Sequence, residues 1–295
     1  MRSNFFRTHP YLFAAALMIT SCASFSLMNV FIRLGSETIH TTMLVFLRNL
    51  ITMIVFIPWV IKDNFKLVRT KRLSSHFWRA TIGIVGMQSW FYCIATLPLT
   101  HATALSFTAP IFSTIFAVLF LKEKADTWRW LAMALGFSGV LIILRPAGDE
   151  FSLLSLIVLF TTSMWAIAGM LIKSLTDTES PLRIVFFMVL FMSIWSLPPA
   201  LYYWQWPSLT VWFYLVIIAC FAFVAQWSLA KAYSLADIVT LTPYDFSRLI
   251  FTSILAYIAF GESSDIYTWV GAAIIVTSAL MNARRDAKSA NDTIA

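Results

Sequence analysis

The chain has 295 residues, of which 60% are hydrophobic and only 12% are charged. Its mean hydropathy is +0.80, and soluble globular proteins contain roughly twice this share of charged residues. The composition therefore excludes an ordinary soluble domain. The net charge of +7 does not indicate nucleic-acid binding, because the lysines and arginines lie between apolar stretches, where anionic lipid and membrane orientation explain them.

Ten apolar stretches approach the length of about 20 residues that a helix needs to cross a bilayer. Short polar breaks separate runs that are otherwise nearly continuous. The first run continues to Ile32, which favours an uncleaved first helix over a lipoprotein signal cleaved at Cys22. The predicted spans are residues 11–32, 41–61, 77–97, 101–121, 127–144, 151–172, 181–203, 210–233, 237–260 and 267–283.

The distribution of lysine and arginine predicts the orientation of these spans. With the amino terminus inside, only Arg33 and Arg145 fall in outer connections, and Arg48 and Arg248 lie within spans. The remaining 17 of the 21 basic residues, with Arg79 counted among them, belong to inner segments. This bias follows the positive-inside rule. We predict a multi-pass protein of the bacterial inner membrane with both termini in the cytoplasm.

The two halves of the chain repeat each other at a spacing of about 139 residues. Identical residues at this spacing include Phe107 with Phe246 and Glu123 with Glu262. Because each half has an odd number of spans, the second copy must be inverted in the membrane, an arrangement common among secondary transporters. The fold prediction is an all-α polytopic membrane protein of ten transmembrane helices in two inverted five-helix repeats. The predicted repeats are residues 11–145 and 151–284.

Charged residues inside the spans are the first candidates for function, because a charge at that depth is costly and normally faces a protein interior or a water-filled path. Arg48 lies in the second span, and Asp245 and Arg248 lie three residues apart in the ninth, where they can pair. The pair is either an internal staple between helices or a contact for substrate. Arg48 either braces its helix against a carbonyl or carboxylate or contacts substrate itself.

Polar and aromatic side chains deep in the spans add further candidates. Gln88 and Gln226 occupy nearly equivalent positions of the two repeats and are predicted to approach the membrane midplane from both halves. Hydrogen bonding between helices is the alternative explanation of such amides. The predicted substrate-binding residues are Asn29, Arg48, Gln88, Trp90, Tyr92, Trp165, Gln226, Tyr244, Asp245 and Arg248.

Two prolines interrupt repeat-related spans, Pro110 in the fourth and Pro243 in the ninth. Proline removes a backbone hydrogen bond and kinks a helix, and the freed carbonyl is tolerated only beside protein or water. The functional interpretation is a hinge or gate, and the alternative is a fixed kink.

Catalytic signatures are absent from the sequence. The histidines and the three cysteines show neither metal-ligand spacing nor a disulfide framework, and neither a nucleophile elbow nor a P-loop occurs. The sequence therefore predicts no enzyme activity, no metal and no cofactor.

Arg33 follows the first span, Phe46-Leu47-Arg48 lies in the second, and Glu123 and Glu262 close the fourth and ninth. Together with ten spans in two inverted halves, this pattern resembles the EamA branch of the drug/metabolite transporter superfamily. Within it, the runs 79–92 and 232–244 are similar to bacterial S-adenosylmethionine uptake transporters. The resemblance implies a central cavity between the two halves.

The predicted function is secondary transport of a small metabolite by alternating access, with S-adenosylmethionine or a similar amphiphilic amino-acid or nucleoside metabolite as cargo. For S-adenosylmethionine, Arg48 or Arg248 is expected to meet the carboxylate and Asp245 the cationic end. Trp90 or Tyr244 is expected to stack on the adenine. The alternatives are an exporter of amino acids or drugs with the same fold, and an intramembrane lipid-modifying enzyme.

Energy coupling and partners follow from the same residues. Arg248 beside Asp245 is expected to keep the carboxylate ionised, which favours exchange or facilitated transport over proton symport. The expected partners are the metabolite and the lipid bilayer, without nucleic acid. The oligomeric state is left open and is compatible with a monomer.

Overall fold

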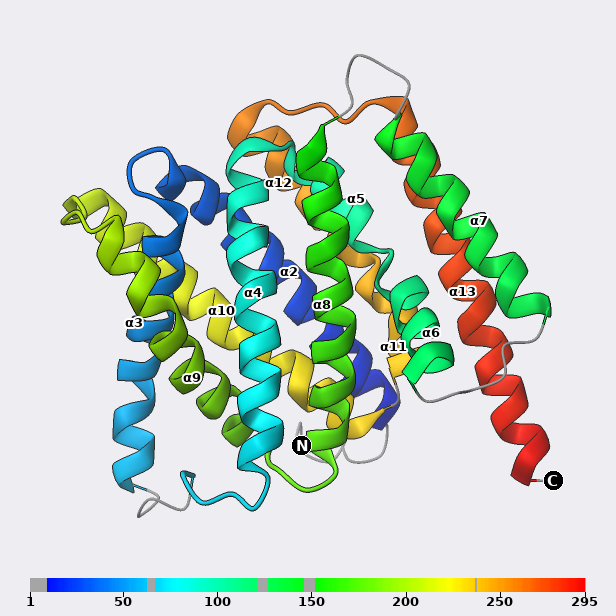
Figure 1. The fold of residues 1–295 in the computed structure, drawn as a ribbon, viewed down its shortest axis with the longest axis horizontal. Helices are drawn as coiled ribbons and strands as arrows, with labels where there is room; N and C mark the ends of the chain where they lie inside the picture. The colour runs from blue at the N-terminus through cyan, green and yellow to red at the C-terminus, as the bar shows by residue number, and fades with distance from the viewer. Residues whose placement is uncertain (1–9, 63–66, 121–126, 146–151, 237, 295) are drawn as a thin grey trace, which may run out of the picture.

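A computed structural model shows the protein as a bundle of α-helices (Figure 1). It describes residues 10–62, 67–120, 127–145, 152–236 and 238–294, and no strand occurs in these ranges. The helices of the first half are α2 (Pro10–Ser36), α3 (Thr41–Lys62), α4 (Leu73–Thr96), α5 (Leu99–Ser106), α6 (Ala109–Phe120) and α7 (Thr127–Leu144). Those of the second half are α8 (Leu153–Thr176), α9 (Pro181–Tyr202), α10 (Leu209–Leu235), α11 (Ile238–Asp245), α12 (Ser247–Phe260) and α13 (Ile266–Ile294).

The protein is an all-α, multi-pass membrane protein. By length and composition, α2, α3, α8, α9 and α10 are able to cross a bilayer. The 24-residue helix α4 is also long enough, but Arg79 and Gln88 make it less apolar than those five. Shorter apolar stretches occur in α7, α12 and α13.

Two of the predicted spans are broken helices in the structure. The fourth consists of α5 and α6, and the ninth consists of α11 and α12. Pro110 is the second residue of α6, a position at which proline is well tolerated, so the break lies directly before it. Pro243 lies inside α11, three residues before the break at Phe246. The side chains of both prolines lie outside what the structure describes.

The two halves run in opposite directions through the bundle (Figure 1). In the view of Figure 1, α2 ascends, α3 descends, α4 ascends, α5 and α6 descend and α7 ascends, whereas the second half begins with a descending α8 and ends with a descending α13. The start of α2 and the end of α13 therefore lie at the same end of the bundle. We call this the lower end and the other the upper end.

The breaks in the two halves meet each other. Phe107 follows α5 and Phe246 follows α11, and they are equivalent at the repeat spacing of about 139 residues. Their rings lie 5.1 Å apart between centroids at an angle of 85°. An edge-to-face contact between equivalent residues is expected where a twofold relation between the halves passes through the bundle.

Helices α7 and α13 form a closely packed pair at one side of the bundle (Figure 1). A Cβ atom added to Gly139 would lie 2.8 Å from the carbonyl oxygen of Gly271, and one added to Gly271 would lie 2.7 Å from that of Gly139. Ser278 donates a hydrogen bond to the carbonyl oxygen of Ala132 in the same pair. At the repeat spacing of 139 residues, Gly139 corresponds to Ser278 and Ala132 corresponds to Gly271. The contact between Gly139 and Gly271 is therefore equivalent to the hydrogen bond between Ser278 and Ala132, and the pair obeys the same twofold relation.

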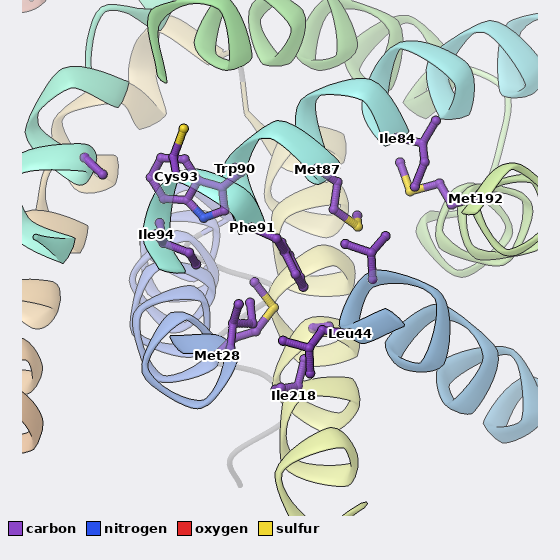
Figure 2. Packing of buried hydrophobic residues seen from close by; sticks show 14 of the residues in the cluster. Met28, Leu44, Ile84, Met87, Trp90, Phe91, Cys93, Ile94, Met192 and Ile218 are labelled. Atoms are coloured by element: carbon purple, nitrogen blue, oxygen red, sulfur yellow. The ribbon is translucent and has the colours of Figure 1, made fainter. Parts of the chain in front are cut away.

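The largest buried cluster of hydrophobic side chains lies around the bundle axis. Figure 2 shows Met28 of α2, Leu44 of α3, Phe91 of α4 and Ile218 of α10 pointing toward one another. All four are at most 5% exposed. This packing joins helices of both halves, and Met28 and Phe91 within it also line the cavity described next.

Candidate functional site

A cavity of about 190 Å³ lies in the middle of the bundle. Side chains from both halves line it, among them those of α2, α3 and α4 from the first and those of α8, α10 and α12 from the second. Of the residues that line the cavity, Met18, Ile172 and Tyr233 lie in the lower parts of their helices. The cavity therefore extends from the middle of the bundle toward the lower end.

Most of the residues predicted to bind substrate line this cavity. Both arginines, the carboxylate and two tryptophans are among them, and each half of the chain contributes. The lining members of the predicted set are Asn29, Arg48, Trp90, Trp165, Gln226, Asp245 and Arg248.

Three predicted residues lie off the cavity. Tyr92 is 49% exposed and Tyr244 is 38% exposed, both on outer surfaces of their helices. Tyr92 comes two residues after Trp90, a turn of about 200° around the helix, and Tyr244 is rotated by about 100° from Asp245. Gln88 is not among the lining residues, and its amide oxygen and nitrogen are buried without a hydrogen-bond partner among the described residues.

The misplacement of Gln88 has a simple cause in the repeat register. The C-caps of α4 and α10 are Leu97 and Ala236, which are equivalent at the spacing of 139 residues. At this spacing the counterpart of Gln226 is Met87, and Met87 does line the cavity. Pairing Gln88 with Gln226 shifts the register by one residue, which rotates the side chain by about 100°.

Arg79 is a cavity residue that the sequence interpretation missed. It was counted as part of an inner segment, but its side chain is buried, with 3% exposure, and lines the cavity. Its Nη2 donates to Oε1 of Gln226 at 3.3 Å. The signal was present in the sequence, because Gly83, Met87 and Trp90 follow Arg79 at intervals of four, eight and eleven residues, on the same face of α4.

Arg48 is held by neutral acceptors. It is 2% exposed, and its Nη1 donates to Oδ1 of Asn49 at 3.0 Å and contacts Sδ of Met87 at 3.0 Å. Among the described residues no carboxylate forms an ion pair with Arg48 or Arg79. The prediction was a brace against a carbonyl or carboxylate, whereas the contact of Arg48 to the neighbouring helix α4 is to the thioether of Met87.

Asp245 and Arg248 pair at the junction of α11 and α12. Nη2 of Arg248 lies 3.4 Å from Oδ2 of Asp245 and 3.3 Å from Oγ of Ser106. Sγ of Cys22 in α2 lies 3.5 Å from Oδ1 of Asp245. The Arg248 guanidinium also lies over the ring of Phe107, 5.6 Å from its centroid. The pair joins helices of both halves and faces the cavity at the same time.

Aromatic side chains form the upper wall of the cavity. Nε1 of Trp90 donates to Oδ1 of Asn29 at 3.1 Å, which links α4 to α2. The rings of Trp90 and Trp165 lie 4.9 Å apart between centroids, tilted by 53°. Trp90 and Phe91 are shown on consecutive positions of α4 in Figure 2. This wall offers flat apolar surface for a ring system.

Charged groups connect several helix ends at the upper end of the bundle. Arg33 at the end of α2 forms an ion pair with Glu262 after α12, and it also donates to the carbonyl oxygen of Leu97 at 3.4 Å. Oε2 of Glu262 accepts a hydrogen bond from the backbone N–H of Leu99 at 3.0 Å. These contacts tie together the ends of α2, α4 and α12 and the start of α5. Glu123 lies outside the described residues.

The lower end has an equivalent contact in the other half. The short connection after α2 and that after α8 align when Arg33 is matched with Lys173. Nζ of Lys173 lies 3.3 Å from the carbonyl oxygen of Ala236, the counterpart of Leu97, and 3.1 Å from that of Tyr233. A cation at each end therefore caps the carboxyl end of a helix, α4 above and α10 below.

Known proteins resemble this chain over nearly its whole length. The family model described as the EamA-like transporter family matches residues 12–145 and 153–284. The riboflavin transporter of Vibrio cholerae is 32% identical over 92% of this chain and 92% of its own length. The S-adenosylmethionine uptake transporter of Rickettsia bellii is 30% identical over 89% of this chain and 90% of its own.

Two more distant comparisons extend the likeness. The pseudopaline exporter of Pseudomonas aeruginosa is 25% identical over 91% of this chain and 95% of its own length. A solved crystal structure with 15% identity superimposes with a TM-score of 0.61, covering 90% of this chain and 98% of the other. The second comparison shows that the fold is shared.

Proposed function

Because the chain belongs to the EamA-like transporter family, we propose that it moves a small metabolite across the bacterial inner membrane by alternating access through the central cavity. Transport, rather than an intramembrane enzyme activity, is the function by which the relatives are named. The observation that supports the site is the cavity itself, which both halves line with charged and aromatic side chains at the depth of the membrane.

The contacts at the two ends support alternating access. The Arg33–Glu262 contacts close the upper end, and the cavity extends toward the lower end. In a protein of two inverted repeats, each half can adopt the conformation of the other. This exchange converts a state that is open at the lower end into one that is open at the upper end. Lys173 already caps α10 as Arg33 caps α4, and in the opposite state it would also take the closing role that Arg33 has here. The pivot that we propose between the halves is the Phe107–Phe246 contact.

The cargo we propose is an amphiphilic metabolite with a flat ring. Trp90 and Trp165 supply apolar faces, and Arg48, Arg79 and the Asp245–Arg248 pair supply charge. Riboflavin and S-adenosylmethionine, for which two relatives are named, both contain a flat heterocycle with polar substituents. Because one relative is named as an exporter, the test also has to measure the direction of transport.

The orientation that we propose has both termini in the cytoplasm, so that the cavity of this structure extends toward the cytoplasm. The charged groups that close the upper end would then face the periplasm. Exchange or facilitated transport is the proposed coupling mode, because the carboxylate of Asp245 is already engaged in an ion pair with Arg248.

Uptake by purified protein in proteoliposomes tests the proposal. Radiolabelled riboflavin and S-adenosylmethionine should be tested as cargo, each supplied either inside or outside the proteoliposomes. The wild type should be compared with two variants that each change one residue of α4. Trp90→Ala should reduce transport of the accepted cargo by about 10-fold or more, because it removes the ring face and the bond to Asn29. Tyr92→Ala is the matched control and should retain wild-type uptake. Equal loss in both variants would contradict a cargo site in this cavity.

Alternating access has its own test at the upper end. In a background without native cysteines, Arg33→Cys and Glu262→Cys can be joined by a short bifunctional methanethiosulfonate. Transport should stop on cross-linking and return after reduction, because the upper end has to open in each cycle. Undiminished transport by the cross-linked protein would contradict the mechanism.

A further inference from the structure

The charges that line the cavity do not balance. Among the described lining residues there are three arginines, Arg48, Arg79 and Arg248, and one carboxylate, that of Asp245. Asp245 already pairs with Arg248, within the same junction of α11 and α12. The two arginines of α3 and α4 therefore have no counter-charge among the described residues.

The hydrogen-bonding capacity of these arginines is also unused. Nε of Arg48 and both Nε and Nη1 of Arg79 are buried without a hydrogen-bond partner among the described residues. Nε of Arg248 is in the same condition. A buried arginine normally finds acceptors for its donors, because an unmade bond of a charged group is costly. Unpartnered donors on three side chains around one cavity leave these guanidinium groups incompletely satisfied by the described residues, so a bound anion in the cavity would supply both acceptors and negative charge.

The partners that are present do not neutralise the two guanidinium groups. Arg79 reaches the amide oxygen of Gln226, and Arg48 reaches the amide oxygen of Asn49 and the thioether of Met87. Amides and thioethers orient a guanidinium but provide no negative charge. Two such cations at membrane depth repel each other and are poorly solvated. Binding of an anion between them relieves both effects.

Apolar walls surround this positive region. Phe25, Phe91, Trp90 and Trp165 line the cavity together with several methionines, whose flexible side chains adapt to irregular shapes. A ligand that fits therefore has a flat or apolar body and an acidic group. A guanidinium fork matches the two oxygens of a carboxylate or phosphate.

We propose that the cargo of this cavity is an amphiphilic anion, a ring-bearing carboxylate or phosphate ester whose acidic group binds between Arg48 and Arg79. This inference rests on the proposed transport function and narrows its substrate class. S-adenosylmethionine fits less well, because its sulfonium and ammonium outnumber its one carboxylate, and only Asp245 is described here to receive them. Riboflavin is neutral and leaves the two arginines unmatched.

Matched pairs of ligands that differ only in the acidic group test the inference. Isothermal titration calorimetry of the purified protein should compare riboflavin with riboflavin 5′-phosphate, which is the phosphate arm, and nicotinamide with nicotinate, which is the carboxylate arm. In at least one arm the anion should bind about 10-fold or more tightly than its neutral partner. The arm that shows the preference identifies the acidic group.

Three variants assign that preference to the cavity. In Arg79→Met the preference for the anion should fall by about 10-fold, and Arg79→Lys should keep part of it, because lysine retains the charge but not the fork. Arg69→Met, which changes an exposed arginine between α3 and α4, should behave as wild type. Loss of preference in Arg69→Met to the same degree would overturn the inference.

The outcomes separate this inference from the proposed function. The anion inference is overturned if the neutral ligand of a pair binds as tightly as the anion. If Trp90→Ala also removes binding of that neutral ligand, the cavity is still supported as the site of transport. Failure of both anions to bind at millimolar concentration also overturns the anion inference. In that case the uptake screen with Trp90→Ala and Tyr92→Ala decides independently whether the cavity transports.

Discussion

Arginines at the ends of the bundle and arginines in the cavity are partnered in different ways. Each of three arginines at the ends contacts a carboxylate. In the cavity, Arg48 and Arg79 contact only amide oxygens and a thioether among the described residues. The ion pairs at the ends are Arg33–Glu262 and Arg145–Asp265 at the upper end and Arg183–Glu179 at the lower end.

This difference separates charges that connect helix ends from charges that, in our proposal, bind the cargo. An ion pair between two helix ends fixes their relative position. Removal of either partner leaves the other charge partly buried without a counter-charge. An arginine that lacks a carboxylate contributes little to the fold and is costly at membrane depth. The anionic cargo proposed above would account for the presence of such an arginine in the cavity.

The largest effect is expected from separating an end pair. Glu262→Gln leaves Arg33 without its carboxylate and should lower the free energy of unfolding by about 2–3 kcal/mol. Adding Arg33→Met to this variant should recover at least half of the loss, since no charge is then left alone. Thermal unfolding in detergent, followed by tryptophan fluorescence, measures both. Additive losses in the double variant would show that the two side chains act separately.

The opposite sign is expected in the cavity. Arg79→Met replaces a buried charge with an apolar side chain of similar length, and no carboxylate loses its partner. The ligand-free protein should unfold at the same or a higher temperature, with a gain of up to about 1 kcal/mol. The same unfolding measurement applies. A loss as large as that of Glu262→Gln would remove the distinction between the two groups of arginines.

Asp245→Asn should change the selectivity of the cavity. The variant removes the carboxylate that offsets part of the positive charge, so anions should bind several-fold more tightly and S-adenosylmethionine more weakly. Calorimetry with riboflavin 5′-phosphate and S-adenosylmethionine measures both directions. Tighter binding of S-adenosylmethionine would contradict the assigned role. A proton-gradient dependence of uptake that Asp245→Asn abolishes would favour symport over exchange.

The smallest effect concerns pH at the lower end. Burial acts to raise the pKa of Glu179, but hydrogen bonds from Arg183 and Thr70 outweigh it and hold this pKa below the usual value of 4.5. The stability that the carboxylate contributes is therefore present above pH 4.5 and is lost as the pH falls through the lowered pKa. The unfolding temperature of wild type should exceed that of Glu179→Gln by the same amount at every pH from 8 to 5. A difference that already shrinks in this range would contradict the lowered pKa.

The sequence predicted the helical architecture well because hydropathy reports directly on which segments can lie in a bilayer. Residues 127–144 were predicted as a span and form α7 with the same bounds. The broken helices were predicted only as interruptions at Pro110 and Pro243. Where α11 ends depends on packing against its neighbours, which periodicity does not report.

The site was predicted less completely. Asp245 and Arg248 were found because a charge inside a span is conspicuous, whereas Arg79 was assigned to a connection by its closeness to the span's end. Gln88 was misplaced by a register shift of one residue, which in a helix is enough to move a side chain off a cavity. Which arginine has a carboxylate partner depends on contacts between distant segments, and a single sequence does not contain them.

Transport of one anion by three forms of the protein decides whether the cavity arginines bind the cargo. Proteoliposomes with wild type, Arg79→Met or Arg69→Met should be assayed for accumulation of whichever anion, riboflavin 5′-phosphate or nicotinate, binds in calorimetry. Arg79→Met should remain folded yet transport about 10-fold less than wild type, and Arg69→Met should transport normally. Wild-type transport by a folded Arg79→Met protein would contradict it.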